Sequence, residues 1–129
     1  MNNEDEIQTR KRVATEFLQL VTVGRIQEAY DNFVDMNGKH HNVFFRAGFP
    51  ALQRAMMDND IQFPGKHFSV KNVIAEGHLI AVHSHLVLNQ REKGMVVVHL
   101  FRFEGDKIVE MWDCGQSIPA DSPNQDGAF

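Results

Sequence analysis

The first half of the chain has the hydrophobic spacing of amphipathic helices. Apolar side chains recur at helical spacing before Gly24, at Ile7, Ala14, Phe17, Leu18 and Val21. A period of 3.6 residues puts such positions on one face, so we expect a first helix that ends at Gly24. A second stripe of this kind predicts a helix from about Arg25 to Asp35. Pro50 suits a first helical turn and predicts a third helix from about Phe49 to Asp58.

From Lys66 onward, the pattern changes to segments rich in β-branched and aromatic residues, separated by glycines. These segments are residues 67–76, 78–89, 95–103 and 107–118. Consecutive strands joined by short turns pair antiparallel, so we expect a curved four-stranded meander, to which the extended piece around His41 can add. The predicted fold class is α+β, with three N-terminal helices packed on a strongly curved antiparallel sheet. The face of the sheet that the helices do not cover also carries apolar side chains, which favours packing on a second subunit.

Composition narrows the class of protein. The 129 residues, 43% of them hydrophobic, predict one domain over residues 1–129, with an irregular polar tail from about residue 119. A net charge of -4 without a basic block argues against nucleic acid or an acidic membrane as a partner. The N-terminus is acidic, and no apolar run approaches the ~20 residues that span a bilayer, so we expect a soluble cytoplasmic protein. The single cysteine, Cys114, is expected to pack rather than to react.

The segment from Val96 to Gln116 predicts a β-hairpin that carries His99 and Asp113 through apolar surroundings. Gly105 at the first loop position suits a two-residue type II′ turn. Because side chains alternate between the faces of a sheet, that turn alone would put Asp113 on the opposite face from His99. A three-residue, bulged loop would put both side chains on one face.

Asp113 is the strongest candidate for chemistry, and His99 is the second. Burial of a carboxylate beside Trp112, in so apolar a strand, would raise its pKa towards values useful for proton transfer. The alternative is a solvated carboxylate at the end of the strand. His99 lies among valine, leucine and phenylalanine, so it is either a hydrogen-bonded core histidine or a pocket group that works with Asp113.

Four further polar residues are candidates for a pocket. His83 and His85 form a His-x-His pair on one strand, with both rings on the same face. After Gly77, this spacing imitates the start of the cupin metal motif, but the glutamate that should follow is missing. We therefore expect no bound metal, and we interpret both as hydrogen-bonded histidines in or near a pocket. His41 and Asn42 begin an apolar extended segment that can also reach a pocket.

The C-terminal block HLFRFEGDKIVEMWDCGQSIPADS resembles the segment FRFxxGKIxEHWDxxQxxP that closes the SnoaL-like proteins of the NTF2-like superfamily. The resemblance extends across essentially the whole chain, because further segments come in the order that this family has. These segments are the first two helices, HHN at residues 40–42, AVHSH at residues 81–85 and the ending NQDGAF. The resemblance implies a cone-shaped α+β barrel with a deep apolar pocket. It also implies a homodimer formed through the outer face of the sheet.

In the family's cyclases, the aspartate at the position of Asp113 is the general acid/base of an intramolecular aldol condensation that needs neither metal nor cofactor. A histidine at the position of His99 lines the same pocket. The resemblance therefore contradicts the turn chemistry, and it requires a bulge around Gly105 and Asp106 or in the strand beyond. This chain also departs from the family: Met111 replaces a histidine, Gly105 and Asp106 stand in reverse order, and many relatives carry aspartate in place of His99.

Two functions are compatible with these observations. As an enzyme, the protein would be a cofactor-independent cyclase or isomerase in which Asp113 removes a proton alpha to a carbonyl of a small apolar substrate. A pocket histidine such as His99 would hold the enolate oxygen. As a non-catalytic protein, it would bind an apolar ligand in the same pocket or serve as a dimeric interaction domain. The side chains expected around the ligand are His41, Asn42, His83, His85, Phe101 and Met111, and the binding hypothesis adds Phe17 and Phe103.

Overall fold

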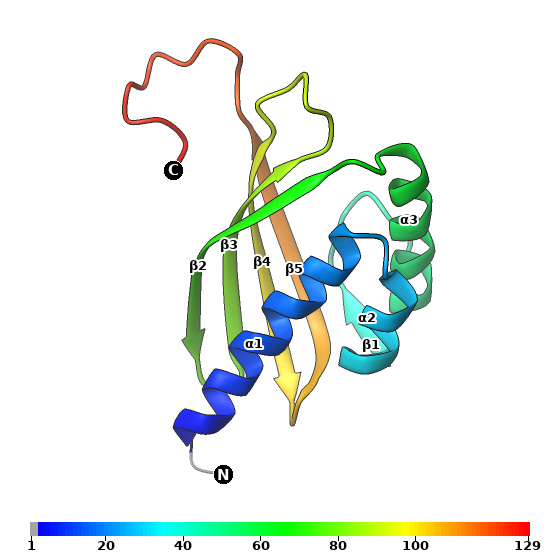
Figure 1. Cartoon of the computed structure of the whole chain (residues 1–129). Helices are drawn as coiled ribbons and strands as arrows, with labels where there is room; N and C mark the ends of the chain where they lie inside the picture. Colours follow the sequence, from blue (N-terminus) through cyan, green and yellow to red (C-terminus); the bar gives the residue numbers. More distant parts are fainter. Residues whose placement is uncertain (1–2) are drawn as a thin grey trace.

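Helices come first and strands second along the chain, with one strand inserted among the helices (Figure 1). The computed structural model describes residues 3–129. Its elements are α1 (Asn3–Thr22), α2 (Ile26–Phe33), β1 (Val34–His40), α3 (Phe49–Gln62), β2 (His67–Glu76), β3 (Leu79–Val87), β4 (Met95–Glu104) and β5 (Lys107–Ser117). The four strands of the second half therefore form where the alternating segments predicted them.

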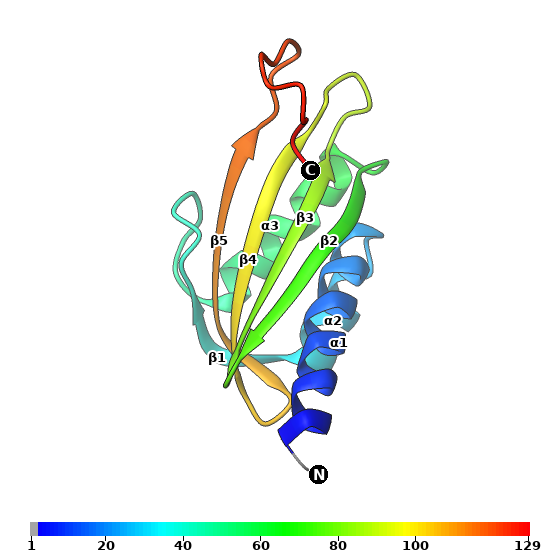
Figure 2. The same cartoon turned by 90° about the vertical axis from the view of Figure 1, so that its left-hand side faces the viewer.

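The five strands make one sheet in the order β1-β5-β4-β3-β2. Strands β2 to β5 form the predicted antiparallel meander. Strand β1 joins β5 in parallel and extends the sheet at its edge. All three helices lie on the same side of this sheet, so its outer face is free of helices (Figures 1 and 2).

The core lies between the helices and the inner face of the sheet. Aromatic rings from α1, α2 and β4 meet edge to face, because Phe17 lies 5.2 Å from Tyr30 and 5.8 Å from Phe101 between ring centroids. Such edge-to-face pairs add about 0.5–1.5 kcal/mol to the burial of the rings. Phe17, Phe101 and Phe103 are all buried in this core.

The second helix is shorter than the hydrophobic spacing predicted. It ends at Phe33, and Val34–His40 forms β1, although the dipeptide Asn37-Gly38 is typical of a turn. Strand β1 approaches β5 so closely that a Cβ on Gly38 would lie 2.3 Å from the carbonyl oxygen of Val109. A glycine that suggested a turn is thus needed for strand packing. The third helix begins at Phe49 as predicted but continues to Gln62.

The cationic run of residues 10–12, in a helix flanked by acidic residues, predicts a solvated face, but Arg10 is buried. Arg10 is 7% exposed, and its Nε donates a hydrogen bond of 3.3 Å to the carbonyl oxygen of Gly105. The guanidinium also lies 3.8 Å from Glu6. Because a buried guanidinium needs such partners, Arg10 fixes the β4–β5 turn against α1.

Candidate functional site

A β-bulge in β5 places the two strongest candidate residues on one face. The turn between β4 and β5 has two residues, since Glu104 pairs with Lys107, and Gly105 has a φ of +57°, as a type II′ turn requires. Phe103 then pairs with Ile108, but Arg102 pairs with Glu110, so Val109 is an extra residue. The shift by one reverses the alternation of β5 beyond that point.

His99 and Asp113 are consequently direct cross-strand partners. Both face the helices, on the same side of the sheet as the buried Phe101 and Phe103. The turn chemistry and the bulge expected from the family resemblance are therefore both present. The turn itself is tight, and the extra residue lies in the strand beyond it.

The two side chains border a cavity of about 410 Å³. It lies between the inner face of the sheet, the C-terminal end of α1, α3 and the loop of residues 42–45. Its walls are mainly apolar: Leu18, Val21, Val43, Phe44, Phe45, Met56, Phe68, Leu86, Leu88, Met95 and Val97. The polar side chains are Thr22, Asn42, Asn59, Lys66, His99 and Asp113. Few polar groups in an apolar cavity are the usual composition of a small-molecule site.

Asp113 is held by an amide from the loop after β1. The Nδ2 of Asn42 donates a hydrogen bond of 3.0 Å to Oδ2 of Asp113. The Oδ1 of Asn42 accepts a hydrogen bond of 3.0 Å from the backbone N–H of Phe44, which fixes the orientation of the amide. The prediction that Asn42 reaches the cavity is confirmed, and the contact connects the cavity carboxylate to the loop that carries Phe44.

His99 is neutral at neutral pH. Burial lowers its pKa from 6.5 to about 4, and the charge of Asp113 opposes this shift only in part. The 3.9 Å between its Nε2 and Oδ2 of Asp113 is therefore not an ion pair at pH 7, and it is too long for a hydrogen bond. Among the described residues, its buried Nδ1 finds no hydrogen-bond partner. The ring stacks on Phe101, with 6.0 Å between centroids.

His40 holds the loop that delivers Asn42, a role that the sequence did not indicate. A histidine beside a turn sequence is most simply exposed, but His40 is only 6% exposed. Its Nδ1 accepts a hydrogen bond of 3.1 Å from the backbone N–H of Asn42, so its Nε2 carries the proton and donates to the carbonyl oxygen of Arg46 at 2.7 Å. Both ring nitrogens therefore bind the backbone of the same loop.

His83 and His85 are hydrogen-bonded as predicted, to Asn72 and to the carbonyl oxygen of Lys93, but they do not line the cavity. Ile80, Val82 and Ser84 are the buried residues of β3, so the two histidines point from the outer face. Their rings lie 5.5 Å and 4.9 Å from the ring of Phe129, respectively. The C-terminal tail, which has no helix or strand after Ser117, thus returns to the sheet. Within residues 3–129, no three His, Cys, Asp or Glu side chains gather in a metal-binding group.

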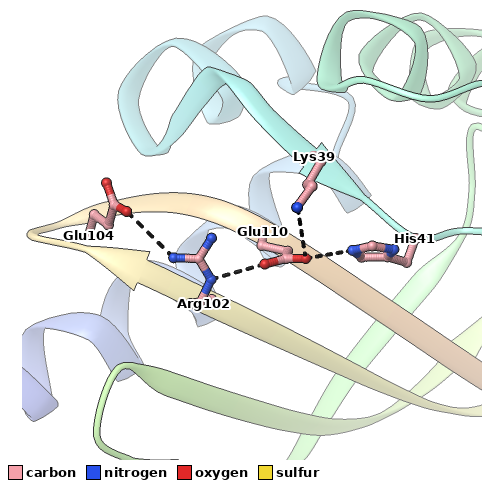
Figure 3. A network of polar contacts seen from close by, with 5 residues as sticks. All are labelled: Lys39, His41, Arg102, Glu104 and Glu110. Carbon is pink, nitrogen blue, oxygen red and sulfur yellow. Dashed lines mark hydrogen bonds and ion pairs between the residues drawn. The ribbon is translucent and has the colours of Figure 1, made fainter.

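His41 also lies outside the cavity, contrary to the prediction. Its Nε2 donates a hydrogen bond of 2.6 Å to Glu110, and its ring stacks on Trp112 at 5.1 Å between centroids. Arg102 and Lys39 contact the same carboxylate, at 3.0 Å and 3.9 Å (Figure 3). The hydrogen bond from His41 is the largest cause that lowers the pKa of Glu110. This network ties β1, β4 and β5 together.

Phe101 and Met111 lie in the core and not in the cavity wall, so their predicted contact with a ligand is wrong. They are cross-strand partners, 0% and 5% exposed. Phe17 and Phe103, named with them under the binding hypothesis, are buried in the core as well. Burial, and to a lesser extent the charge of Asp113, raises the pKa of Tyr30 in the same core.

Sequence reasoning missed three polar residues of the cavity: Thr22, Asn59 and Lys66. Asn59 and Lys66 were interpreted as the boundary of a helix and the start of a strand. One sequence feature could have pointed to Lys66. It lies between the Pro64-Gly65 turn and a predicted strand, so it lies where the chain passes from the third helix to the sheet. Its ammonium group is held by Asp60 of α3, a contact that the strand pattern from Lys66 onward does not show.

The chain matches the family model of the SnoaL-like domain over residues 14–111, more than half of its length. The protein therefore belongs to the SnoaL-like domain family. The match includes Asn42 and His99 and ends at Met111, just before Asp113. The chain matches no curated protein.

Solved structures confirm the NTF2-like α+β fold. A SnoaL-like protein of unknown function from Burkholderia thailandensis superposes with a TM-score of 0.71 at 12% identity, over 85% of this chain and 97% of that one. An NTF2-like protein of unknown function from Burkholderia xenovorans gives 0.70 at 19% identity, over 92% and 90%. A protein named as a proposed polyketide cyclase from Acidithiobacillus ferrooxidans gives 0.67 at 15% identity, over 83% and 87%. At these identities, the likeness shows the fold alone.

Proposed function

We propose that the protein binds a small, largely apolar carbonyl compound in the cavity, and that Asp113 removes a proton alpha to the carbonyl. The observation that carries this proposal is the position of one carboxylate, 21% exposed, in a cavity with mainly apolar walls, opposite a neutral histidine. A carboxylate in such surroundings is a suitable general base, because few water molecules compete for it. Ring closure or isomerisation would follow from the resulting enolate.

Asn42 and His99 have different parts in this proposal. Asn42 occupies Oδ2 of Asp113, which leaves Oδ1 to meet the substrate proton. His99 is neutral, and the single N–H of its ring can donate a hydrogen bond to the enolate oxygen. The proposed step uses these side chains alone, so we expect it to proceed without a cofactor.

A second candidate function is ligand binding without chemistry. One observation favours it: the 3.9 Å between Nε2 of His99 and Asp113 shows no assembled acid/base pair. Val43 and Phe44, both in the cavity wall, are 87% and 86% exposed, so they can close on an apolar ligand at the mouth. Such a binding protein would hold the same class of molecule and release it unchanged.

Hydrogen exchange in D₂O tests the two functions without knowledge of the product. A panel of small aryl and alkyl ketones is incubated with the protein, and loss of the alpha-proton signal is followed by NMR. We expect exchange above background, and we expect Asp113→Asn to reduce it by at least ~100-fold while ketone affinity changes little. Glu104→Gln, on the exposed β4–β5 turn, is the matched control. Exchange that survives in Asp113→Asn would refute the assignment of the base.

A further inference from the structure

The cavity has a second polar region at the end of the sheet opposite to the β4–β5 turn. Lys66 directly precedes β2, whose first residues pair with the end of β3, and Leu86 of β3 pairs with Met95 at the start of β4. His99 is four residues further along β4, a rise of about 13 Å. Lys66 and Asp113 thus border the same cavity at different positions along β4.

Lys66 is a buried cation. Its side chain is 5% exposed, and its Nζ lies 3.1 Å from Oδ1 of Asp60 and 3.5 Å from the carbonyl oxygen of Phe63. Asp60 supplies the counter-charge that a buried ammonium needs, and it packs against Gly24 at the end of α1. An ammonium has three N–H donors, so within residues 3–129 one donor of Lys66 has no acceptor.

Asn59 stands beside this ammonium in the cavity lining. It belongs to the last turn of α3, and its side-chain amide makes no hydrogen bond with the described part of the chain. Two unused donors, one on an ammonium and one on an amide, therefore border an otherwise apolar cavity. A hydrogen bond from an ammonium to an anionic acceptor is about twice as strong as one between neutral groups.

We propose that Lys66 and Asn59 bind the carboxylate, or a similar anionic head group, of an elongated apolar ligand. This inference rests on the proposed function, because it concerns the same cavity and names the class of its ligand. The negative charge of Asp113 in the other polar region repels a carboxylate, so the head group stays near Lys66 and the apolar part extends towards Asp113. The carbon that Asp113 would deprotonate lies about 13 Å from the head group, roughly the separation of the two polar regions along β4.

Competition binding tests this ligand class. N-phenyl-1-naphthylamine, an apolar fluorescent probe, is displaced by octanoate or by octanol, which share a chain length and differ in charge. We expect the wild type to bind octanoate roughly tenfold more tightly than octanol. In the charge-balanced variant Asp60→Asn/Lys66→Met, we expect this preference to vanish while octanol affinity stays within about twofold. Lys93→Met, an exposed lysine between β3 and β4, is the matched control.

The outcomes separate this inference from the proposed function. Probe binding without a preference for octanoate, or a preference that survives in the double variant, would overturn the role of Lys66 alone. Failure of the probe to bind the wild type would overturn both. Asp113→Asn should keep the octanoate preference and lose only proton exchange, and a loss of the preference in that variant would count against a separate head-group site. Circular dichroism confirms that the double variant is folded.

Discussion

At the scale of single residues, Asn42 connects the mouth of the cavity to its carboxylate. One amide group receives the backbone N–H of Phe44 and donates to Asp113. A ligand that moves Phe44 therefore also changes the hydrogen bonding of Asp113. An apolar contact with Phe44 at the mouth can thus alter the hydrogen bond that Oδ2 of Asp113 accepts inside the cavity.

The neutral state of His99 predicts how stability depends on pH. In the unfolded chain this histidine binds a proton below pH 6.5, but in the folded protein it does so only below about 4. The unfolded state therefore binds more protons in this window, so the contribution of His99 is complete above about pH 6.5 and is lost as the pH falls to about 4. The slope should approach about 1.4 kcal/mol per pH unit. Urea unfolding of the wild type and of His99→Gln, across this range, measures it.

The difference between the two proteins isolates this histidine from other titrating groups. We expect the free energy of unfolding of the wild type to fall more steeply with acid than that of His99→Gln. Parallel curves would show that His99 binds its proton equally well in both states, which is incompatible with its burial.

At the scale of elements, strand β1 determines where Asn42 lies, and Gly38 permits its approach to β5. Gly38→Ala would place a Cβ 2.3 Å from the carbonyl oxygen of Val109 and 2.8 Å from Cε2 of Phe49. Because backbone cannot yield as a flexible side chain can, we expect a loss of about 1–3 kcal/mol in the free energy of unfolding. We also expect weaker binding of N-phenyl-1-naphthylamine, since the loop after β1 would move.

Gly65→Ala is the matched control for this substitution. A Cβ at that position meets no atom within 4 Å, and its φ is outside the left-handed region. Its free energy of unfolding should change by less than about 0.5 kcal/mol. Equal stability of the two variants in urea would contradict the close packing of β1 on β5.

The elements of the second half could be predicted from the sequence because their pairing is local. Alternating patterns and glycines located β2 to β5 within a few residues. An extended piece around His41 was expected to add to the sheet, but the bounds of β1 and its pairing could not be predicted, since its partner β5 follows about 70 residues later and its glycine suggested a turn. The face of β3 was ambiguous for a similar reason: the row with Ile80 and Val82 and the row with Leu79 and Ala81 are both apolar. Contact with the helices, which the pattern of β3 does not contain, decides between them.

The candidate site could be predicted in part. His99 and Asp113 were found because polar groups are rare in so apolar a hairpin, and Asn42 because it follows a histidine pair at the start of an apolar segment. His41 takes the opposite direction from Asn42, since Glu110 and Trp112 hold it on the outer face. Neighbouring residues in a loop have no fixed alternation that could have shown this.

At the scale of the whole molecule, the sheet separates a face covered by helices from one that carries apolar and charged side chains. Within residues 3–129, no helix is long and apolar enough to cross a membrane. Ile74 and Leu79, on the outer face, are 62% and 37% exposed, and Val98 and Leu100 lie in the neighbouring strand β4. We propose that this face packs on a second copy of the chain, as the family resemblance implies.

Sedimentation velocity tests this association. We expect a wild-type dimer at micromolar concentration, and we expect Val98→Lys to give a monomer, because two lysines at a symmetric interface would be desolvated and would repel each other. Gln27→Lys, on the exposed face of α2, should leave the dimer intact. A monomeric wild type, or a dimer unaffected by Val98→Lys, would refute the outer face as the interface.

The bulge at Val109 determines which side chains of β5 face the cavity. If Val109 paired regularly with Arg102 instead of forming the bulge, β5 would keep its length, but Trp112 would stand opposite His99 and Asp113 would face outward. Such a strand would keep every residue of the Trp-Asp motif and still turn its carboxylate away from the cavity, whereas deletion of Val109 would remove the bulge and leave Asp113 opposite His99. A motif search alone would accept a strand without the bulge, whereas the cross-strand register of its histidine and its aspartate would reject it.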